Sequence, residues 1–220
     1  MSNARANILA RLRAVAPQEP AATPEPDFYP ATKLGHAERI AQLKRLMEHM
    51  HAEVIVTDPQ HWIATLKDVL RARQVNGLLY GPAGPLGAAL EANWDSELPP
   101  LVGYTEEVEQ CKERLFALDA GITSTRGAVA DVGALMLWPD ANEPRLLSLV
   151  PAVHIAVLEA THIHDSLADA IARERWAEGM PTNALLISGP SKTADIELVL
   201  TFGVHGPKEL IVLVLDDERG

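Results

Sequence analysis

The apolar residues of this chain fall into short continuous runs that alternate with longer stretches of helical periodicity. Runs rich in Val, Ile and Leu predict buried strands at 52–57, 77–81, 98–104, 120–123, 133–138, 153–160, 184–188 and 209–215. Helical spacing predicts helices at 34–50, 58–73, 85–93, 105–118, 165–178 and 191–202, with Asp165 capping the fifth. This alternation predicts an α/β fold, with helices covering both faces of a mostly parallel sheet.

The first 32 residues follow a different pattern. Apolar residues at helical spacing predict an amphipathic helix that docks on the domain or on a partner. These residues are Ile8, Leu9, Leu12 and Val15. Residues 16–32 contain five prolines, which block helix formation and predict an extended linker. We therefore expect a helix and proline-rich linker at 1–32, followed by an α/β domain at 33–220.

Charge and cysteine content narrow the classes of function. The formal net charge is −11 and no Lys/Arg cluster is present, which argues against binding nucleic acid or an anionic membrane. No apolar stretch reaches the ~18–20 residues of a membrane span. The single cysteine, Cys111, can neither form an internal disulfide nor hold an iron–sulfur cluster by itself. We expect a cytoplasmic protein, because low cysteine content fits that compartment.

The segment 188–195 is the first candidate for chemistry. It joins a predicted strand to a predicted helix, where free backbone N–H groups and the helix dipole favour an anion. Its candidate ligand-binding residues are Ser188, Gly189, Ser191, Lys192, Thr193 and Asp195. The segment lacks the glycine and lysine order of a P-loop, so a helix cap with no ligand is the alternative interpretation.

A second candidate is the segment 121–127, between the predicted strands at 120–123 and 133–138. Glycine and hydroxyl residues gather there and suit the lining of a polar pocket: Gly121, Thr123, Ser124 and Thr125. Farther along, Asp131 could accept a hydrogen bond from a ligand hydroxyl or act as a base. Alternatively, it could only cap or hydrogen-bond the neighbouring backbone.

A third candidate precedes the last strand and contains His205, Gly206 and Lys208. His205 could titrate near neutral pH and Lys208 could bind an anion, although a solvated histidine is the simpler interpretation. The candidate catalytic residues of the chain are Asp131, Lys192 and His205.

Three histidines allow a weaker metal hypothesis. His154, His162 and His164 could be ligands, with Asp165 nearby. No fourth ligand or supporting group is specified, and Asp165 is explained as a helix cap, so we expect no metal.

Several sequence blocks together resemble the lactate utilization protein C family, whose shared unit is the LUD domain. The matching blocks are "GITSTRGAVADVGALML" (121–137), "RLLSLVPAVHIAVLE" (145–159) and "ISGPSKTADIELVLTFGVHGPKELIVLVLD" (187–216), after an N-terminal helix and proline-rich link. The resemblance covers most of the chain and is weak over 33–104. Where the family commonly has threonine after the aspartate, this chain has Val132, so a hydroxyl is missing beside Asp131.

The resemblance implies a fold similar to the sugar-isomerase and CoA-transferase-like proteins. It also implies a role beside two iron–sulfur partner proteins in oxidising L-lactate to pyruvate. This chain would be the cluster-free subunit, with no cofactor of its own, and the loops at 121–133 and 188–209 would surround one pocket for a small carboxylate or phosphorylated ligand. The family brings no defined catalytic residues.

Two other functions stay open. The chain could be a non-catalytic module that binds a small anion or nucleotide-like ligand and docks on a partner. It could also be an isomerase or CoA-transferase-like enzyme by analogy of fold, but the one nearby glutamate, Glu197, falls inside a predicted helix.

Overall fold

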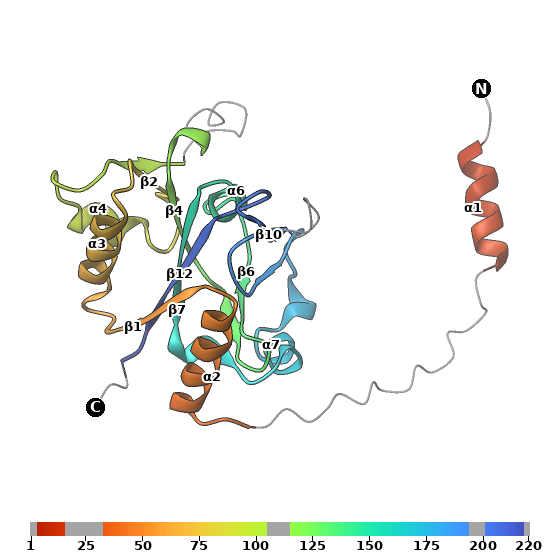
Figure 1. Cartoon of the computed structure of the whole chain (residues 1–220). Helices are drawn as coiled ribbons and strands as arrows, with labels where there is room; N and C mark the ends of the chain where they lie inside the picture. Colours follow the sequence, from red (N-terminus) through yellow and green to blue (C-terminus); the bar gives the residue numbers. More distant parts are fainter. Residues whose placement is uncertain (1–3, 16–32, 105–114, 194–200, 218–220) are drawn as a thin grey trace. The chain divides into compact units, whose positions relative to one another are not determined.

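The computed structural model describes residues 4–15, 33–104, 115–193 and 201–217. It contains two units, Met1–Pro30 and Ala31–Gly220. In the first unit, α1 (Ala4–Val15) corresponds to the predicted N-terminal helix (Figure 1). The side chains of Ile8 and Leu12 in this helix are exposed. None of the described helices has the length and hydropathy of a transmembrane span.

The second unit is built on a six-stranded sheet in which every neighbouring pair is parallel. The strand order is β1-β12-β7-β4-β2-β3. The strands are β1 (Glu53–Thr57), β2 (Leu78–Tyr80), β3 (Leu101–Gly103), β4 (Ala120–Ser124), β7 (Val153–Glu159) and β12 (Glu209–Leu215). The predicted mostly parallel α/β fold is confirmed.

One face of this sheet is covered by α3 (Trp62–Arg73) and α4 (Gly87–Asn93) (Figure 1). The alternation of side chains along β12 shows how the two faces divide. Ile211, Leu213 and Leu215 pack with Leu66 and Leu70 of α3. The intervening apolar residues of β12 point to the opposite face. Both faces of the strand are therefore buried, which explains its continuous apolar run.

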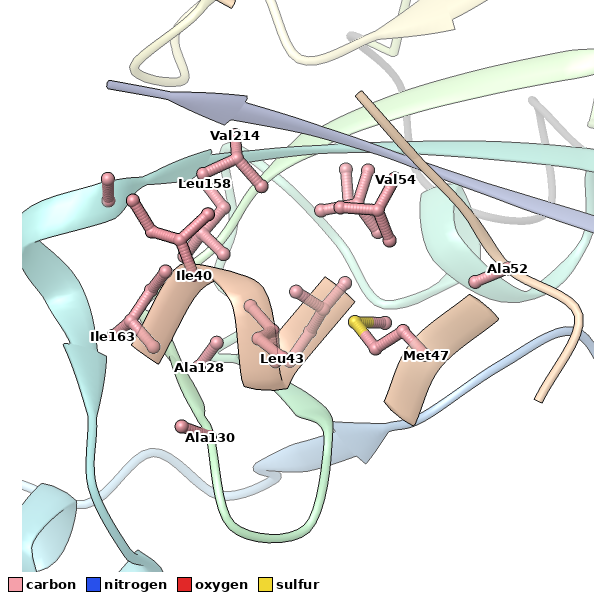
Figure 2. Packing of buried hydrophobic residues seen from close by; sticks show 14 of the residues in the cluster. Ile40, Leu43, Met47, Ala52, Val54, Ala128, Ala130, Leu158, Ile163 and Val214 are labelled. Atoms are coloured by element: carbon pink, nitrogen blue, oxygen red, sulfur yellow. The ribbon is translucent and has the colours of Figure 1, made fainter. Parts of the chain in front are cut away.

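The opposite face is covered by α2 (His36–His49), α6 (Leu146–Leu149) and a second, four-stranded sheet. The order of that sheet is β8-β5-β6-β9, with β8 (Ile163–His164), β5 (Gly127–Val129), β6 (Ala134–Leu137) and β9 (Leu185–Ile187). Figure 2 shows α2 between the two sheets, where Leu43 and Met47 are fully buried. The second sheet was not expected as a separate layer.

Two predicted helices differ from the structure by more than one terminal turn, and most of the predicted helix at 105–118 lies outside the described residues. Lys192–Thr193 and Thr201–Phe202 are β10 and β11, paired antiparallel, so the prediction of a helix across 191–202 was wrong at both ends; 194–200 lies outside the described residues. The predicted helix at 165–178 is shorter, α7 (Leu167–Arg173), followed by the short 3₁₀ helix η2 (Trp176–Glu178).

The cap of α7 is also different from the prediction. The Ser166 hydroxyl accepts a hydrogen bond from the Asp169 N–H, 3.2 Å. Asp165 is buried instead and accepts from the Leu34 N–H, 3.2 Å, at the start of α2. It thus fixes the entry of the chain into the domain.

The order of the strands reverses direction beside β2. The chain runs from β2 outward to β3, then returns to the other side of β2 as β4 and continues to β7 and β12. In an open parallel sheet, such a reversal leaves a crevice at the carboxyl ends of the two strands, where ligands bind. The carboxyl ends of β2 and β4 are therefore the place to look for a site.

Candidate functional site

A cavity of about 330 Å³ lies at this reversal, and we call it cavity 1. The carboxyl end of β4 supplies Thr123, Ser124, Thr125 and Arg126, and the loop after β2 supplies Pro85. The remaining wall comes from the end of β6, the segment after it, α6 and the segment before β9. Its residues are Leu137, Trp138, Pro139, Asp140, Glu143, Pro144, Arg145, Ser148 and Pro181. A concave site with a few convergent polar groups is typical of a small-molecule pocket.

Glu143 is the central carboxyl group of cavity 1. Its side chain is buried, and it accepts hydrogen bonds from the Ser124 hydroxyl (2.5 Å) and the Ser124 N–H (3.1 Å). Burial raises the pKa of the Glu143 carboxyl, and the hydrogen bonds from Ser124 offset part of the rise. Glu143 can occupy this position because Gly81 and Gly84 have no side chains. A Cβ atom would lie 3.1 Å from Glu143 Cγ at Gly81 and 2.8 Å from it at Gly84.

Two arginines line cavity 1, and they differ in whether their guanidinium groups make ion pairs within the protein. Arg126 makes an ion pair with Glu174 (Nε to Oε2, 2.6 Å) and stacks over the Trp138 ring at 4.9 Å. Arg145 is exposed, and its guanidinium has no ion-pair partner among the described residues. Arg145 is therefore the cation available to an anionic ligand, since a guanidinium binds a carboxylate through two parallel hydrogen bonds.

A second cavity of about 180 Å³, cavity 2, lies near the amino ends of β7 and β12. Its lining residues are Ser148, Leu149, His154, Ile187, Gly189, Pro190, Ser191, His205, Gly206, Pro207 and Leu210. Ser148 of α6 lines both cavities.

A buried hydrogen bond joins the walls of the two cavities. Thr123 Oγ1, in cavity 1, and His154 Nε2, in cavity 2, are 2.9 Å apart. His154 is 1% exposed, and its Nδ1 has no hydrogen-bond partner among the residues that the structure describes. Burial lowers the pKa of the His154 imidazole to about 4, so the ring is neutral at physiological pH.

This buried histidine should make stability depend on pH. Below pH ~6.5 the unfolded chain binds a proton at His154, whereas the folded chain does so only near pH 4. Stability is therefore lost as pH falls through this window, by roughly 3 kcal/mol. Denaturant unfolding at stepped pH should show this loss and a weaker one in His154→Gln. An equal loss in both proteins would contradict the prediction.

The structure divides the residues predicted for one pocket between the two cavities. Thr123, Ser124 and Thr125 line cavity 1. Cavity 2 receives Gly189, Ser191, His205 and Gly206. The linings given above include none of Gly121, Asp131, Ser188, Lys192, Thr193 and Lys208, and Asp195 and Glu197 lie outside the described residues.

The backbone polar groups of Ser191, part of the predicted anion site, are hydrogen-bonded within the protein. Its N–H donates to the Pro207 carbonyl (2.9 Å) and its carbonyl accepts from the Gly203 N–H (3.0 Å). Lys192 lies in β10, with its Nζ 5.6 Å from the centroid of the Phe202 ring. The Ser191 backbone and the Lys192 side chain therefore stabilise the region of the antiparallel pair β10 and β11.

Two other predicted site residues, Gly121 and Asp131, lie outside both cavities. Gly121 lies under α6, where a Cβ atom would come within 2.5 Å of the Leu147 carbonyl oxygen. Asp131 is exposed in the turn between β5 and β6, beside Val132, which is 56% exposed. The hydroxyl that Val132 lacks would thus lie at the surface.

The three histidines of the metal hypothesis are in different surroundings. His154 is in the central sheet, His162 is exposed, and His164 is buried with its Nε2 3.2 Å from Glu174 Oε1. Across the described ranges, no group of three or more His, Cys, Asp or Glu side chains could hold a metal ion.

Sequence reasoning assigned no role to Glu143, Arg145 or Ser148, and treated His154 only as a weak metal ligand. The first three follow β6 of the second sheet, and no spacing in the sequence places that segment beside β4. The one available signal was a loop of prolines and charged residues after an apolar strand, "WPDANEPR" at 138–145.

Comparisons with known proteins agree with this architecture. A family model described as the LUD domain matches residues 40–215. A DUF162 family protein from Deinococcus radiodurans, known from a crystal structure, superposes with a TM-score of 0.62 at 20% identity, covering 84% of this chain and 100% of that one. At this identity the likeness shows the fold alone.

Curated relatives extend over almost the whole chain. An uncharacterized protein of Neisseria meningitidis serogroup B is 34% identical, covering 97% of this chain and 94% of the relative. Lactate utilization protein C 1 of Bacillus mycoides is 27% identical, covering 96% and 93%. Lactate utilization protein C of Bacillus subtilis is 28% identical, covering 81% and 78%. This chain therefore belongs to the LUD domain family.

Proposed function

We propose that this chain is the cluster-free subunit of a lactate utilization system that oxidises L-lactate to pyruvate together with iron–sulfur partner proteins. The names of the relatives from Bacillus mycoides and Bacillus subtilis support the pathway. The structural observation that carries the proposal is cavity 1, which places an uncommitted guanidinium, two hydroxyls and a buried carboxyl at the sheet reversal.

The groups of cavity 1 suit a short 2-hydroxy acid. Arg145 binds its carboxylate through paired hydrogen bonds. The Ser124 hydroxyl donates to Glu143 and the Thr125 hydroxyl donates to the Val157 carbonyl, so each hydroxyl oxygen can still accept a hydrogen bond from a ligand. Glu143, held by Ser124, takes up the proton of the substrate hydroxyl, and its raised pKa brings it closer to the pH at which a base works best.

In this proposal the hydrogen on C2 of lactate leaves with its two bonding electrons and passes to an acceptor on the partner proteins. The chain contains one cysteine, whereas an iron–sulfur cluster is usually held by four thiolates. The residues of this chain therefore do not fit a cluster. Its own contribution is to bind and orient the carboxylate and to hold the hydroxyl proton at Glu143.

Replacing the free guanidinium tests this assignment. In the system reconstituted with its partners, Arg145→Gln should raise the KM for L-lactate about 10–100-fold, because a charged hydrogen bond contributes ~1.5–3 kcal/mol. Lactate-dependent dye reduction measures it. The matched control is Arg71→Gln, an exposed arginine of α3 paired with Asp68. An unchanged KM in Arg145→Gln would refute a role for cavity 1 in binding lactate.

A second candidate is a small-anion-binding module that performs no chemistry. The observation that favours it is the hydrogen bonding of Glu143 to Ser124, which occupies the carboxyl group within the protein. This module would still be stabilised by the anion, by ~2.7 kcal/mol at a hundredfold excess over Kd. Stabilisation lost in Arg145→Gln, with turnover unaffected by Glu143→Gln, would identify it.

A further inference from the structure

Arg126 lines cavity 1 directly after the carboxyl end of β4. Its side chain is 44% exposed, and its ion pair joins Nε to Glu174 Oε2. The terminal nitrogens Nη1 and Nη2 make no hydrogen bond or ion pair with any residue that the structure describes. These two nitrogens form an edge of the guanidinium that binds a carboxylate or phosphate through parallel hydrogen bonds. The ion pair with Glu174 therefore occupies only part of this guanidinium.

The guanidinium of Arg126 is held in place from two sides. Its Cζ lies 4.9 Å from the centroid of the Trp138 ring, within the range of a cation–π contact. Trp138 in turn packs edge-on against Trp176, with ring centroids 5.5 Å apart. Glu174 is 12% exposed, and its second oxygen, Oε1, lies 3.2 Å from Nε2 of the buried His164. Because these contacts orient Arg126 before a ligand binds, less side-chain entropy is lost on binding.

The other charged groups of the wall leave an anion to be supplied by the ligand. Among the described residues that line cavity 1, the charged side chains are Arg126, Arg145, Asp140 and Glu143. Both acids already accept hydrogen bonds from the protein. Asp140 Oδ1 accepts from the N–H groups of Asn142 (2.7 Å) and Glu143 (2.8 Å), and Glu143 accepts from the serine described above. A guanidinium carries only donors, so the free edges of the two arginines favour acceptors on a ligand.

Cavity 1 has room for a ligand larger than lactate. At ~30 Å³ for each water-sized group, its volume of about 330 Å³ corresponds to about eleven such groups. L-Lactate fills only about half of this volume on the same scale. A carboxylate or phosphate at the other end of the ligand fits in the remainder.

We propose that Arg126 is a specificity-determining residue of cavity 1. It binds a second anionic group of the ligand, while Arg145 binds the carboxylate next to the hydroxyl. Cavity 1 then prefers 2-hydroxy acids that carry a second carboxylate or a phosphate over those with an uncharged end, such as L-lactate. Glu174 is a positioning residue, since it acts through Arg126. This preference rests on the proposed function only in that cavity 1 binds a 2-hydroxy acid.

Calorimetric binding to the full chain tests this preference. L-Malate should bind with a Kd about 10–100-fold lower than that of 2-hydroxybutyrate, which has the same carbon chain without the second charge. Arg126→Gln should raise the Kd of L-malate to that of 2-hydroxybutyrate and leave the Kd of 2-hydroxybutyrate unchanged. The unchanged value also shows that the variant is folded. Arg126→Lys keeps the charge without the paired donors, so it should retain only part of the preference.

Glu174→Gln tests the positioning role. The amide has the size of the carboxyl group but lacks the charge that orients Arg126. The preference for L-malate should therefore decrease, with the Kd of 2-hydroxybutyrate unchanged. The matched control is Glu178→Gln, because Glu178 is exposed and pairs with Arg175 away from cavity 1. A change common to both ligands would indicate a structural role only.

The outcomes separate this proposal from the lactate assignment. Equal Kd values for L-malate and 2-hydroxybutyrate in the parent would overturn it, as would a preference that persists in Arg126→Gln. The lactate assignment fails separately if Arg145→Gln leaves the KM for L-lactate unchanged while the Kd of L-malate still depends on Arg126. If the chain binds neither acid, cavity 1 is not a site for 2-hydroxy acids and both proposals are wrong.

Discussion

Glu143→Gln should reduce the turnover of L-lactate by the reconstituted system about 10²–10⁴-fold, the range typical of a lost general base. The amide has the shape of the carboxyl group but cannot take up the substrate proton. The KM should change less than kcat, because in the proposed site the carboxylate is bound by Arg145, which this variant retains. Steady-state dye reduction over a range of lactate concentrations measures both constants.

The stability of this variant shows whether the effect is chemical. Burial raises the pKa of Glu143, so ionising it costs stability as pH rises above the ordinary value of a carboxyl group. A neutral amide avoids that cost, and Glu143→Gln should unfold at the same or a higher denaturant concentration. Glu48→Gln, on exposed α2 surface and paired with Lys44, is the matched control. Turnover equal to the parent in Glu143→Gln would favour the non-catalytic module.

Leu43→Ala should destabilise the second unit by about 2–5 kcal/mol, the range of buried leucine truncations. Leu43 is fully buried in the cluster between α2 and the two sheets (Figure 2). Such a dense site collapses only in part around the lost methyl groups, so a void adds to the lost burial. Equilibrium unfolding in urea, followed by circular dichroism, gives the change in free energy.

The matched control for this truncation is Leu12→Ala, because Leu12 of α1 is 64% exposed. Truncating an exposed leucine should change the free energy of unfolding by no more than ~0.5 kcal/mol. Equal unfolding midpoints for Leu43→Ala and the parent would show that α2 is not part of the cooperative core.

Much of the fold followed from local pattern. The run at 209–215 is β12, and the run at 153–160 contains β7, because strands buried on both faces need apolar residues at every position. The two ends of the segment 191–202 were misread as helix because Ile196, Val199 and Leu200 have helical spacing, while Lys192–Thr193 and Thr201–Phe202 pair as strands. A two-residue ladder leaves too little periodicity to recognise.

The candidate site was predicted only in part. The hydroxyl residues at 123–125 were found because they follow a strand whose carboxyl end must face a loop. Glu143 and Arg145 were missed because they reach the site from a segment some twenty residues later, after β5 and β6 of the second sheet. His154 was considered as a metal ligand because a sequence shows neither burial nor an unpartnered nitrogen atom.

The sequence by itself determined that this chain is an acidic α/β protein with buried strands, and it carried the blocks of the LUD domain family. Periodicity and composition are local properties, so they can be read directly from consecutive residues of the sequence. Only the tertiary structure decided that the strand order reverses at β2 and β4, and that Glu143 and Arg145 meet Ser124 there. It also separated the expected pocket into two cavities joined through Thr123 and His154. The physical reason is that the packing of both layers, rather than any local pattern, selects which distant segments share a wall.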